Sequence, residues 1–245
     1  MRPATVPSPA TLGLTRANAA ADLAELGWNN LQSVDLLWTL AAAGNPDLAL
    51  NTLIRIYELA PELDSHVREN EELRVRLIAL VGGSTAFGDH LAANPHLWKE
   101  LAKPLPTPKQ MLQELLSVVG AQPATYAQNL DRPDTARDDL STPGTYRAAE
   151  GDFHPELKAA YRTLMMRIAA FDLAGTFYSR KGQNKPQPRV EFSEVTKLTT
   201  ALADAALTAA LAVAVRRVYE DAPLDAQLTV LAMGKCGAGE LNYIS

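Results

Sequence analysis

The chain has very little cysteine: Cys236 is the single thiol among 245 residues. A disulfide within the chain is therefore excluded, as is a zinc site built from several cysteines. The cytoplasm is the expected compartment for such a sequence. Histidine is also scarce, and the four residues are His66, His90, His96 and His154. Their spacing is not that of metal ligands, so surface or packing roles are expected.

The chain also lacks an excess of positive charge and a long apolar run. Its 23 Lys and Arg against 28 Asp and Glu give a formal net charge of −5, which disfavours broad electrostatic binding to nucleic acid. The longest uncharged apolar stretch, 205–215, is much shorter than the roughly 20 residues that cross a bilayer. The N-terminus has no apolar core of a signal peptide. We expect neither a nucleic-acid partner nor a membrane partner.

What the chain does have is helical periodicity over most of its length, and its 47% hydrophobic content is enough for a packed core. The pattern predicts helices over residues 15–27, 33–43, 46–60, 66–81, 84–93, 95–103, 108–119, 154–178 and 193–220. Three predicted starts combine an N-capping side chain with a proline at the first helical position: Asn45-Pro46, Asn94-Pro95 and Thr107-Pro108. Gly82 and Gly83 followed by Ser84 indicate a helix end and a new cap.

The two longest predicted helices differ in pattern. The helix over 154–178 carries one continuous apolar stripe, formed by Leu157, Tyr161, Leu164, Ile168, Phe171, Gly175 and Tyr178. The helix over 193–220 is rich in Ala, Leu and Val and has a single polar stripe, formed by Lys197, Thr200, Asp204 and Thr208. We expect this second helix to be central in a bundle. The mostly polar segment 121–152, with several prolines, is expected to be a mobile surface connection.

The end of the chain has a different character. Residues 228–233 are apolar with enough branched side chains for a buried strand, and they run into a glycine-rich turn. Gly234, Gly237 and Gly239 can take positive φ or let the backbone approach a ligand closely. Lys235 places a cation beside exposed N–H groups. This combination suits a polyphosphate.

Two common phosphate motifs do not fit this turn. A Walker A loop has its lysine at the end of a longer glycine loop and followed by Ser or Thr, whereas Lys235 follows the first glycine and precedes Cys236. A dinucleotide fingerprint has glycines spaced G-x-G-x-x-G, and here the spacing is G-x-x-G-x-G. Neither motif describes this segment.

The segment resembles the M-G-K-x-G-x-x-E-L-N-Y-x-S signature of the glutamine synthetase adenylyltransferase family. Nine of its thirteen positions match: Met233, Gly234, Lys235, Gly237, Glu240, Leu241, Asn242, Tyr243 and Ser245. Upstream stretches are similar to the same family, namely 77–91 with 94–98, 167–175, and 194–196 with 202–207. The resemblance covers roughly residues 70 to 245. Within it, 121–152 and 179–190 look like insertions.

The resemblance implies a fold that is mainly α, with a helical bundle leading into the first strand and glycine turn of a DNA polymerase β-like nucleotidyltransferase domain. The full-length protein would then be α+β. In the family, the serine matching Ser245 is followed by D-x-D on a second strand. Alternation along a strand puts both carboxylates on one face, where they can hold the two metal ions, here Mg²⁺, of a nucleotidyl transfer. Neither carboxylate is in this sequence, so we expect it to be inactive by itself.

The resemblance also implies a reaction. Family members carry two nucleotidyltransferase domains, and the Met1 start, the long helical lead-in and the E-L-N-Y form look like the first copy. That copy removes adenylyl groups by phosphorolysis: phosphate attacks the adenylylated tyrosine of glutamine synthetase and releases ADP. The second copy would attach AMP from ATP. The implied partners are glutamine synthetase and a PII-type signalling protein.

These considerations divide the chain into an N-terminal helical region (1–120), a flexible connection or insertion (121–152), long packed helices (153–222) and the start of a nucleotidyltransferase domain (223–245). The expected contacts to nucleotide or phosphate, which the family match suggests, are Gly234, Lys235, Gly237, Glu240, Asn242 and Ser245. No catalytic or metal-binding residue is expected in the chain itself.

Each of these residues has a simpler interpretation. Lys235 can be a solvated loop lysine, Glu240 can open a helix and be stabilised by the helix dipole, and Ser245 can cap a turn. At the level of the whole chain, the alternative is a non-catalytic helical module that binds a partner protein, with the terminal strand as a remnant.

Overall fold

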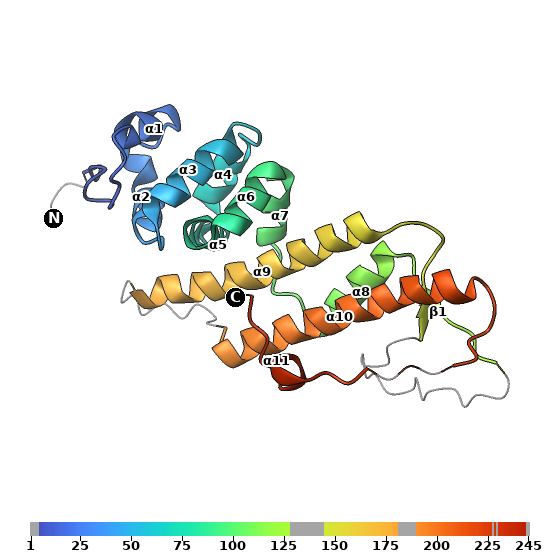
Figure 1. Cartoon of the computed structure of the whole chain (residues 1–245). Helices are drawn as coiled ribbons and strands as arrows, with labels where there is room; N and C mark the ends of the chain where they lie inside the picture. The colour runs from blue at the N-terminus through green and yellow to red at the C-terminus, as the bar shows by residue number, and fades with distance from the viewer. Residues whose placement is uncertain (1–4, 128–144, 181–189, 227, 229, 244–245) are drawn as a thin grey trace. The chain divides into compact units, whose positions relative to one another are not determined.

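The structure, a computed structural model, describes residues 5–127, 145–180, 190–226, 228 and 230–243, and the chain is mainly helical as expected (Figure 1). Its α-helices are α1 (Ala19–Glu25), α2 (Val34–Ala41), α3 (Pro46–Tyr57), α4 (Leu63–Glu69), α5 (Glu71–Gly83), α6 (Thr85–Ala93), α7 (Trp98–Leu101), α8 (Pro108–Val118), α9 (His154–Arg180), α10 (Phe192–Tyr219) and α11 (Gly234–Gly237). Two 3₁₀ helices, η1 (Leu31–Ser33) and η2 (Pro95–Leu97), and two short strands, β1 (Gln122–Pro123) and β2 (Tyr146–Arg147), complete the described elements.

The chain forms two compact units. The first contains residues 1–104 and 169–190, and the second contains 105–168 and 191–245. Helix α9 contributes its C-terminal part to the first unit and its N-terminal part to the second. The four-part division made from the sequence stays a prediction, and the insertion proposed at 179–190 lies almost wholly outside the described residues.

Side-chain caps explain where several helices of the first unit begin. The Asn45 side chain accepts the Leu48 N–H at 3.0 Å, with Pro46 at the first helical position, as predicted. Ser84 accepts the Phe87 N–H at 3.4 Å at the start of α6, which confirms the new cap after the glycine pair. Each cap satisfies an N–H that has no partner inside the helix.

Two expectations for this unit were wrong. The single helix expected over 66–81 is two helices, because Asn70 has extended backbone and its side chain caps α5 by accepting the Leu73 N–H at 3.0 Å. Asn94 does not cap the helix that follows it. Its side-chain amide instead donates to the His90 carbonyl at 3.0 Å and so closes the end of α6, and Pro95 begins only a 3₁₀ turn.

The core of the first unit lies between α3, α5 and α6. Leu50, Leu53 and Ile56 of α3 are at most 1% exposed. Gly82 lets α5 approach the start of α3, because an added Cβ would lie 2.7 Å from the Ala43 Cβ. The C-terminal part of α9 covers α5 from another side, and the Arg76 guanidinium lies 4.0 Å from the centre of the Phe171 ring.

Asp47, in the first turn of α3, anchors the segment before α1. Its carboxylate accepts the Thr15 hydroxyl at 2.5 Å, the Thr15 N–H at 3.0 Å and the Arg16 N–H at 3.4 Å. The Thr15 side-chain hydrogen bond is the main reason that the pKa of Asp47 is lowered, and the backbone N–H groups act in the same direction. The carboxylate therefore favours the folded state in its ionised form.

This contact gives the folded state a pH dependence. A carboxyl whose pKa is lowered on folding stabilises the protein above its unfolded-state pKa, near 3.8, and that stabilisation is lost as the pH falls through the folded-state value. We expect Thr15→Val to raise the pKa of Asp47 toward its ordinary value and to flatten the acid side of the stability profile. Carbon-detected NMR titration of Asp47 measures the first effect, and urea unfolding across acidic pH measures the second. An unchanged Asp47 titration in the variant would contradict the assignment.

The second unit is built around α10. Helix α8 begins at the predicted cap, where Thr107 and Gln110 form a capping box, and it packs along α10. Leu202, Ala205 and Ala209 of α10 are buried, as expected for a central helix. Thr200 and Thr208 of the predicted polar stripe are also buried, and each hydroxyl donates to the carbonyl four residues earlier, at 2.9 and 2.8 Å.

Length and composition alone would allow α10 to cross a membrane. The stretch 205–215 underestimated this property because the helix continues toward its N-terminus from 204 back to 198 with Asp204 as the single charge. The core helix of a soluble protein meets the same criteria, and α10 packs against α8 and β2 within its unit. The apolar character of α10 is therefore weak evidence for a membrane span.

The small antiparallel sheet was not expected from the sequence. Gln122 pairs with Arg147 and Pro123 with Tyr146, so the two ends of the segment 121–152 are joined to each other, while 128–144 lie outside the described residues. The sheet is held on α10 because the Ala148 N–H donates to the Ala212 carbonyl at 3.0 Å. The Arg216 guanidinium donates to the Ala148 carbonyl at 2.8 Å. The two described ends of the segment 121–152 therefore pack within the second unit.

Candidate functional site

The glycine-rich segment forms a tight structure of its own. Residues Gly234–Gly237 make the one-turn helix α11, and Gly234 and Gly239 have φ of 60° and 72°. The sequence allowed either positive φ or a close backbone approach at each of the three glycines, and Gly234 and Gly239 have positive φ. Gly237 has an ordinary φ, but an added Cβ would collide with the carbonyl oxygen of Ala232. A residue with a Cβ would therefore be strained at Gly234 and Gly239 because of the positive φ, and would clash at Gly237.

Backbone hydrogen bonds close this segment. The Ala238 N–H donates to the Gly234 carbonyl at 3.0 Å, the Gly239 N–H to the Cys236 carbonyl at 3.1 Å and the Glu240 N–H to the Lys235 carbonyl at 2.7 Å. The N–H groups at the start of α11 have no acceptor inside the helix, as at any helix start. Such N–H groups carry a partial positive charge, which attracts an anion.

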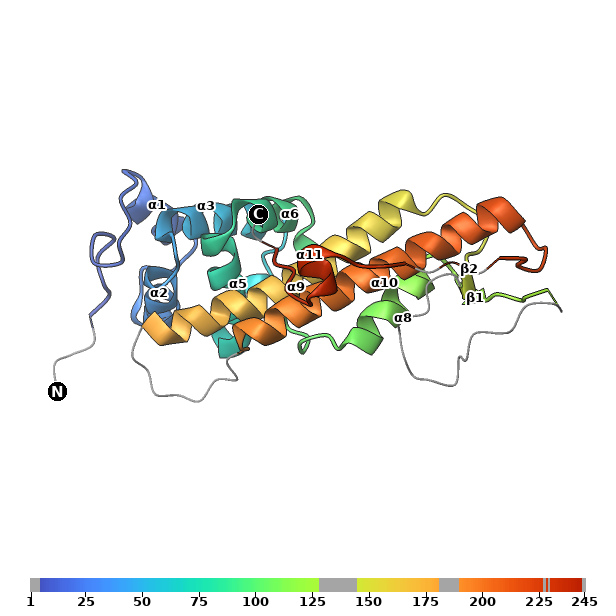
Figure 2. The ribbon, with the colours of Figure 1, turned by 60° about the horizontal axis from the view of Figure 1, so that its bottom comes forward.

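A contact that the sequence did not predict fixes the segment to α10. The Leu241 N–H donates to the Thr200 hydroxyl oxygen at 3.3 Å. Both ribbon views place α11 beside α10 (Figures 1 and 2). The only signal in the sequence was the polar stripe that contains Thr200, because a hydroxyl oxygen that donates its hydrogen to the Thr196 carbonyl can still accept an N–H. Thr200 therefore positions the segment.

The predicted contact residues follow one another along this segment. Lys235, Glu240 and Asn242 are exposed. Within the described residues, no ion pair involves the Lys235 ammonium. Ser245 lies outside the described residues. The assignment of all six residues to nucleotide or phosphate binding stays a prediction.

One interpretation of Glu240 was wrong. The sequence allowed this residue to open a helix, where the dipole would stabilise its carboxylate, but Glu240–Asn242 are not helical. The left-handed backbone at Gly239 ends the turn. The Glu240 N–H still donates to the Lys235 carbonyl, and the Leu241 N–H is directed to Thr200. The helix dipole therefore does not account for an acidic residue at position 240.

The strand expected before the glycines is also absent. The described residues of this stretch, 228 and 230–233, form no strand, and Leu231 and Met233 are 83% and 85% exposed. A strand needs a neighbour to accept and donate its backbone hydrogen bonds, and none lies beside this stretch within the described ranges. The chain pairs with another segment a few residues earlier, at Leu224, which is buried. The Leu224 N–H donates to the Thr125 carbonyl and the Ala127 N–H donates to the Leu224 carbonyl, each at 2.8 Å.

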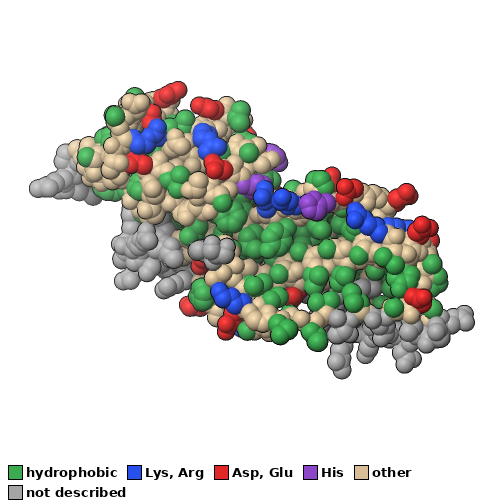
Figure 3. All heavy atoms as spheres, in the orientation of Figure 1, with side chains coloured by type: hydrophobic (Ala, Val, Ile, Leu, Met, Phe, Trp, Pro, Cys, Tyr) green, Lys and Arg blue, Asp and Glu red, His purple; other side chains and the backbone are tan. Residues whose placement is uncertain are grey.

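No group of three or more His, Cys, Asp or Glu side chains is placed to hold a metal ion in the part of the chain that the structure describes. His66 has a packing role: its ring centre lies 4.7 Å from that of Trp98, and its Nδ1 is 3.0 Å from the Glu62 carbonyl oxygen. Cys236 is a partly buried free thiol. On the face shown in Figure 3, acidic and basic side chains are mixed and apolar side chains cover much of the second unit.

Comparison with known proteins gives a consistent result. The family model described as glutamate-ammonia ligase adenylyltransferase matches residues 74–245. A bifunctional glutamine synthetase adenylyltransferase/adenylyl-removing enzyme from Corynebacterium efficiens is 51% identical over 98% of the chain. Proteins with the same name from Nocardia farcinica and Mycolicibacterium smegmatis are 43% and 37% identical over 98% and 100% of the chain. No solved structure matches.

The chain spans about a quarter of these relatives: 24% of the Corynebacterium protein, 23% of the Nocardia protein and 22% of the Mycolicibacterium protein. The matched range of the family model begins close to residue 70, where the resemblance in the sequence begins. The similarity to the individual relatives extends further, because it includes the helices before residue 74.

Proposed function

The chain belongs to the glutamate-ammonia ligase adenylyltransferase family, and on that basis we propose that it is the N-terminal part of a bifunctional enzyme that controls glutamine synthetase by removing and adding AMP on a tyrosine. The half that begins in this chain would catalyse the removal. Phosphate attacks the phosphorus of the adenylylated tyrosine, the bond from phosphorus to the tyrosine oxygen breaks, and ADP and the free tyrosine are released.

The observation that supports this proposal best is the geometry of the glycine-rich segment. Gly234 and Gly239 have the positive φ that a close backbone turn needs, and Thr200 holds the segment against a buried helix. Lys235 extends from the first turn of α11 into solvent. We propose that its ammonium and the adjoining N–H groups bind the phosphates of the nucleotide, while the fold continues as a DNA polymerase β-like nucleotidyltransferase domain.

The described residues do not fit the Mg²⁺ ions of such a reaction. Glu240 is the one carboxylate in the described part of the glycine-rich segment, and it is exposed, whereas two-metal sites hold their ions with several closely placed oxygen ligands. The role we propose for this chain is therefore limited to binding and orienting phosphate groups. ATP would be used by the adenylylating half.

The proposed partners follow from the same family. The names of the relatives contain glutamine synthetase, which would be the protein substrate, and a PII-type protein would carry the nitrogen signal. We propose a cytoplasmic enzyme without a nucleic-acid or membrane partner. The helices of the first unit would then serve to recognise protein surfaces.

A phosphorolysis assay tests the proposal. The full-length protein containing this chain, incubated with adenylylated glutamine synthetase, phosphate and Mg²⁺, is expected to release ADP, and the 245-residue chain alone is expected to release none. ADP formation by the short chain would contradict our placement of the metal ligands outside it. A full-length protein that binds glutamine synthetase but forms no ADP would instead favour the non-catalytic helical module.

A further inference from the structure

One side of α10 presents apolar side chains that lack a cover in the described structure. It is formed by Ala203, Leu207, Ala210, Ala214 and Val218, which are three or four residues apart and so share a side of the helix. Leu207 is 38% exposed and Val218 is 73% exposed. Only 44% of the most apolar 18-residue window of α10 is buried. We call these five residues the open side of α10.

The same side of the helix is covered nearer its N-terminus. Thr200 lies about two helical turns before Leu207 and therefore on the same side. Thr200 is buried, and its hydroxyl oxygen accepts the Leu241 N–H at 3.3 Å. The glycine-rich segment thus lies on this side of α10 at Thr200, and the side is exposed from Leu207 onward.

A second group of exposed apolar side chains comes directly before the glycine-rich segment in the chain. Its members are Leu228, Val230, Leu231 and Met233, and Leu231 and Met233 are more than four-fifths exposed. On the face shown in Figure 3, apolar side chains gather over the second unit. Grouped apolar residues on a protein surface mark a contact with another surface. The glycine-rich segment therefore adjoins two such groups, one along α10 and one along the chain.

The sequence limits what can cover these residues. The stretch 128–144 has Leu130 and Leu140 as its only large apolar residues, and 181–189 has none, so neither offers a matching apolar surface. The chain spans 24% of the Corynebacterium efficiens relative, so most of such a protein lies outside it. In the proposed enzyme, the chain continues from the segment that Thr200 holds, next to the open side of α10.

We propose that the open side of α10 and the apolar residues of 228–233 are an interface within one polypeptide, covered in the full-length enzyme by the part that follows this chain. The covering surface has an apolar centre, and it carries a cation opposite Asp204, an exposed carboxylate at the border of the open side. Such a cover accounts for the apolar composition of α10 without a membrane. The inference rests on the proposed function only in that the chain is part of a longer enzyme.

Hydroxyl-radical footprinting of the full-length protein, read by mass spectrometry in buffer without lipid, tests this proposal. Four leucines of known burial serve as probes. Leu207 and Leu231 are expected to be protected from oxidation to the level of Leu202, which is fully buried on α10, while Leu59, at 70% exposure in the first unit, is oxidised. Oxidation of Leu207 and Leu231 at the level of Leu59 would overturn the proposal, as would protection that appears only after phospholipid vesicles are added.

The same measurement on the 245-residue chain identifies the cover. Protection of Leu202 shows that the second unit is folded, and Leu207 and Leu231 are then expected to be oxidised. Protection of Leu207 in the short chain would assign the cover to the chain itself or to a second copy, and would reject ours. The readout is separate from catalysis: a full-length protein that protects Leu207 but releases no ADP would keep the interface and contradict the proposed phosphorolysis.

A matched pair of variants in the full-length protein locates the interface. Ala214→Glu is tolerated on an open helix side, because glutamate is a good helix former, but beneath a cover it would bury an unpaired carboxylate. We expect it to abolish the protection of Leu207 and to leave Leu202 protected. Ala86→Glu, at an exposed alanine of α6, should leave Leu207 protected. Continued protection of Leu207 in Ala214→Glu would show that the open side is not the interface.

Discussion

Replacing Trp28 by alanine is expected to lower the free energy of unfolding of the first unit by about 4 kcal/mol. The indole is fully buried, at 0% exposure, and it makes a T-shaped contact with the Tyr57 ring. Truncation removes this apolar contact and leaves a cavity that the surrounding helices fill only in part. Urea unfolding followed by circular dichroism measures the change.

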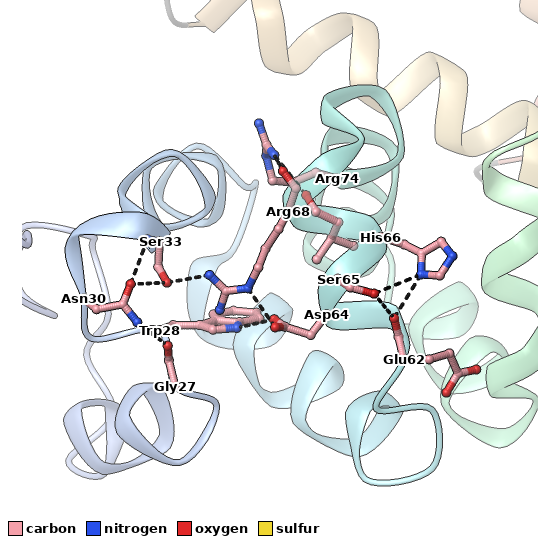
Figure 4. A network of polar contacts seen from close by, with 11 residues as sticks. Gly27, Trp28, Asn30, Ser33, Glu62, Asp64, Ser65, His66, Arg68 and Arg74 are labelled. Atoms are coloured by element: carbon pink, nitrogen blue, oxygen red, sulfur yellow. Dashed lines mark hydrogen bonds and ion pairs between the residues drawn. The ribbon is translucent and has the colours of Figure 1, made fainter.

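Trp28 also belongs to a polar network that adds to this effect. Its N–H and the Arg68 Nε–H occupy the two oxygens of Asp64, and Arg68 donates to the Ser33 hydroxyl at 2.8 Å (Figure 4). The network joins the segment after α1 to α4. Without the indole, Asp64 Oδ1 loses its donor in a partly buried place, which carries a further penalty.

Trp38→Ala is the matched control, because Trp38 is the same residue type and is 41% exposed. We expect it to lower the free energy of unfolding by about 1 kcal/mol or less. Trp28→Phe should fall between the two variants, since it keeps an apolar ring but is smaller than the indole and lacks the N–H donor. A Trp28→Ala variant no less stable than Trp38→Ala would show that the indole is not a principal element of this core.

The helices of this protein could be predicted from its sequence because their determinants are local. Spacing of apolar residues and capping side chains such as Asn45 and Thr107 act within a few residues of the helix they begin. The break at Asn70 was missed although residues 68–72 are all polar and an Asn before two glutamates is a local cap signal. Asn94 was misassigned for another reason: the Asn-Pro pair also fits a cap, but the Asn94 amide turns back to the His90 carbonyl of α6.

Features that depend on distant partners could not be predicted in this way. Strands β1 and β2 are two residues long and are separated by more than twenty positions, so neither leaves an alternating pattern. The expected strand over 228–233 has suitable residues, yet a strand exists only when another backbone pairs with it. The glycine conformations at 234 and 239 were predictable, while their attachment to Thr200 was not.

Lys235→Ala in the full-length enzyme is expected to weaken the use of phosphate or nucleotide by about 1 to 3 kcal/mol, the range for losing a charged hydrogen bond. This prediction depends on the proposed function. Lys235 is exposed in the first turn of α11 and takes part in no ion pair among the described residues. Its removal should therefore leave the stability nearly unchanged and act on substrate binding alone.

Steady-state kinetics of ADP release, with phosphate varied, measures this effect as a fall in kcat/KM. Lys109→Ala is the control, because Lys109 is an exposed lysine at the start of α8 in the same unit. Both variants lose one positive charge, so a lower kcat/KM in Lys235→Ala than in Lys109→Ala would indicate a contact between Lys235 and the phosphate groups. If both variants had the kinetics of the unmodified enzyme, Lys235 would have to be assigned as a solvated loop lysine, and phosphate binding would depend on the backbone N–H groups of α11.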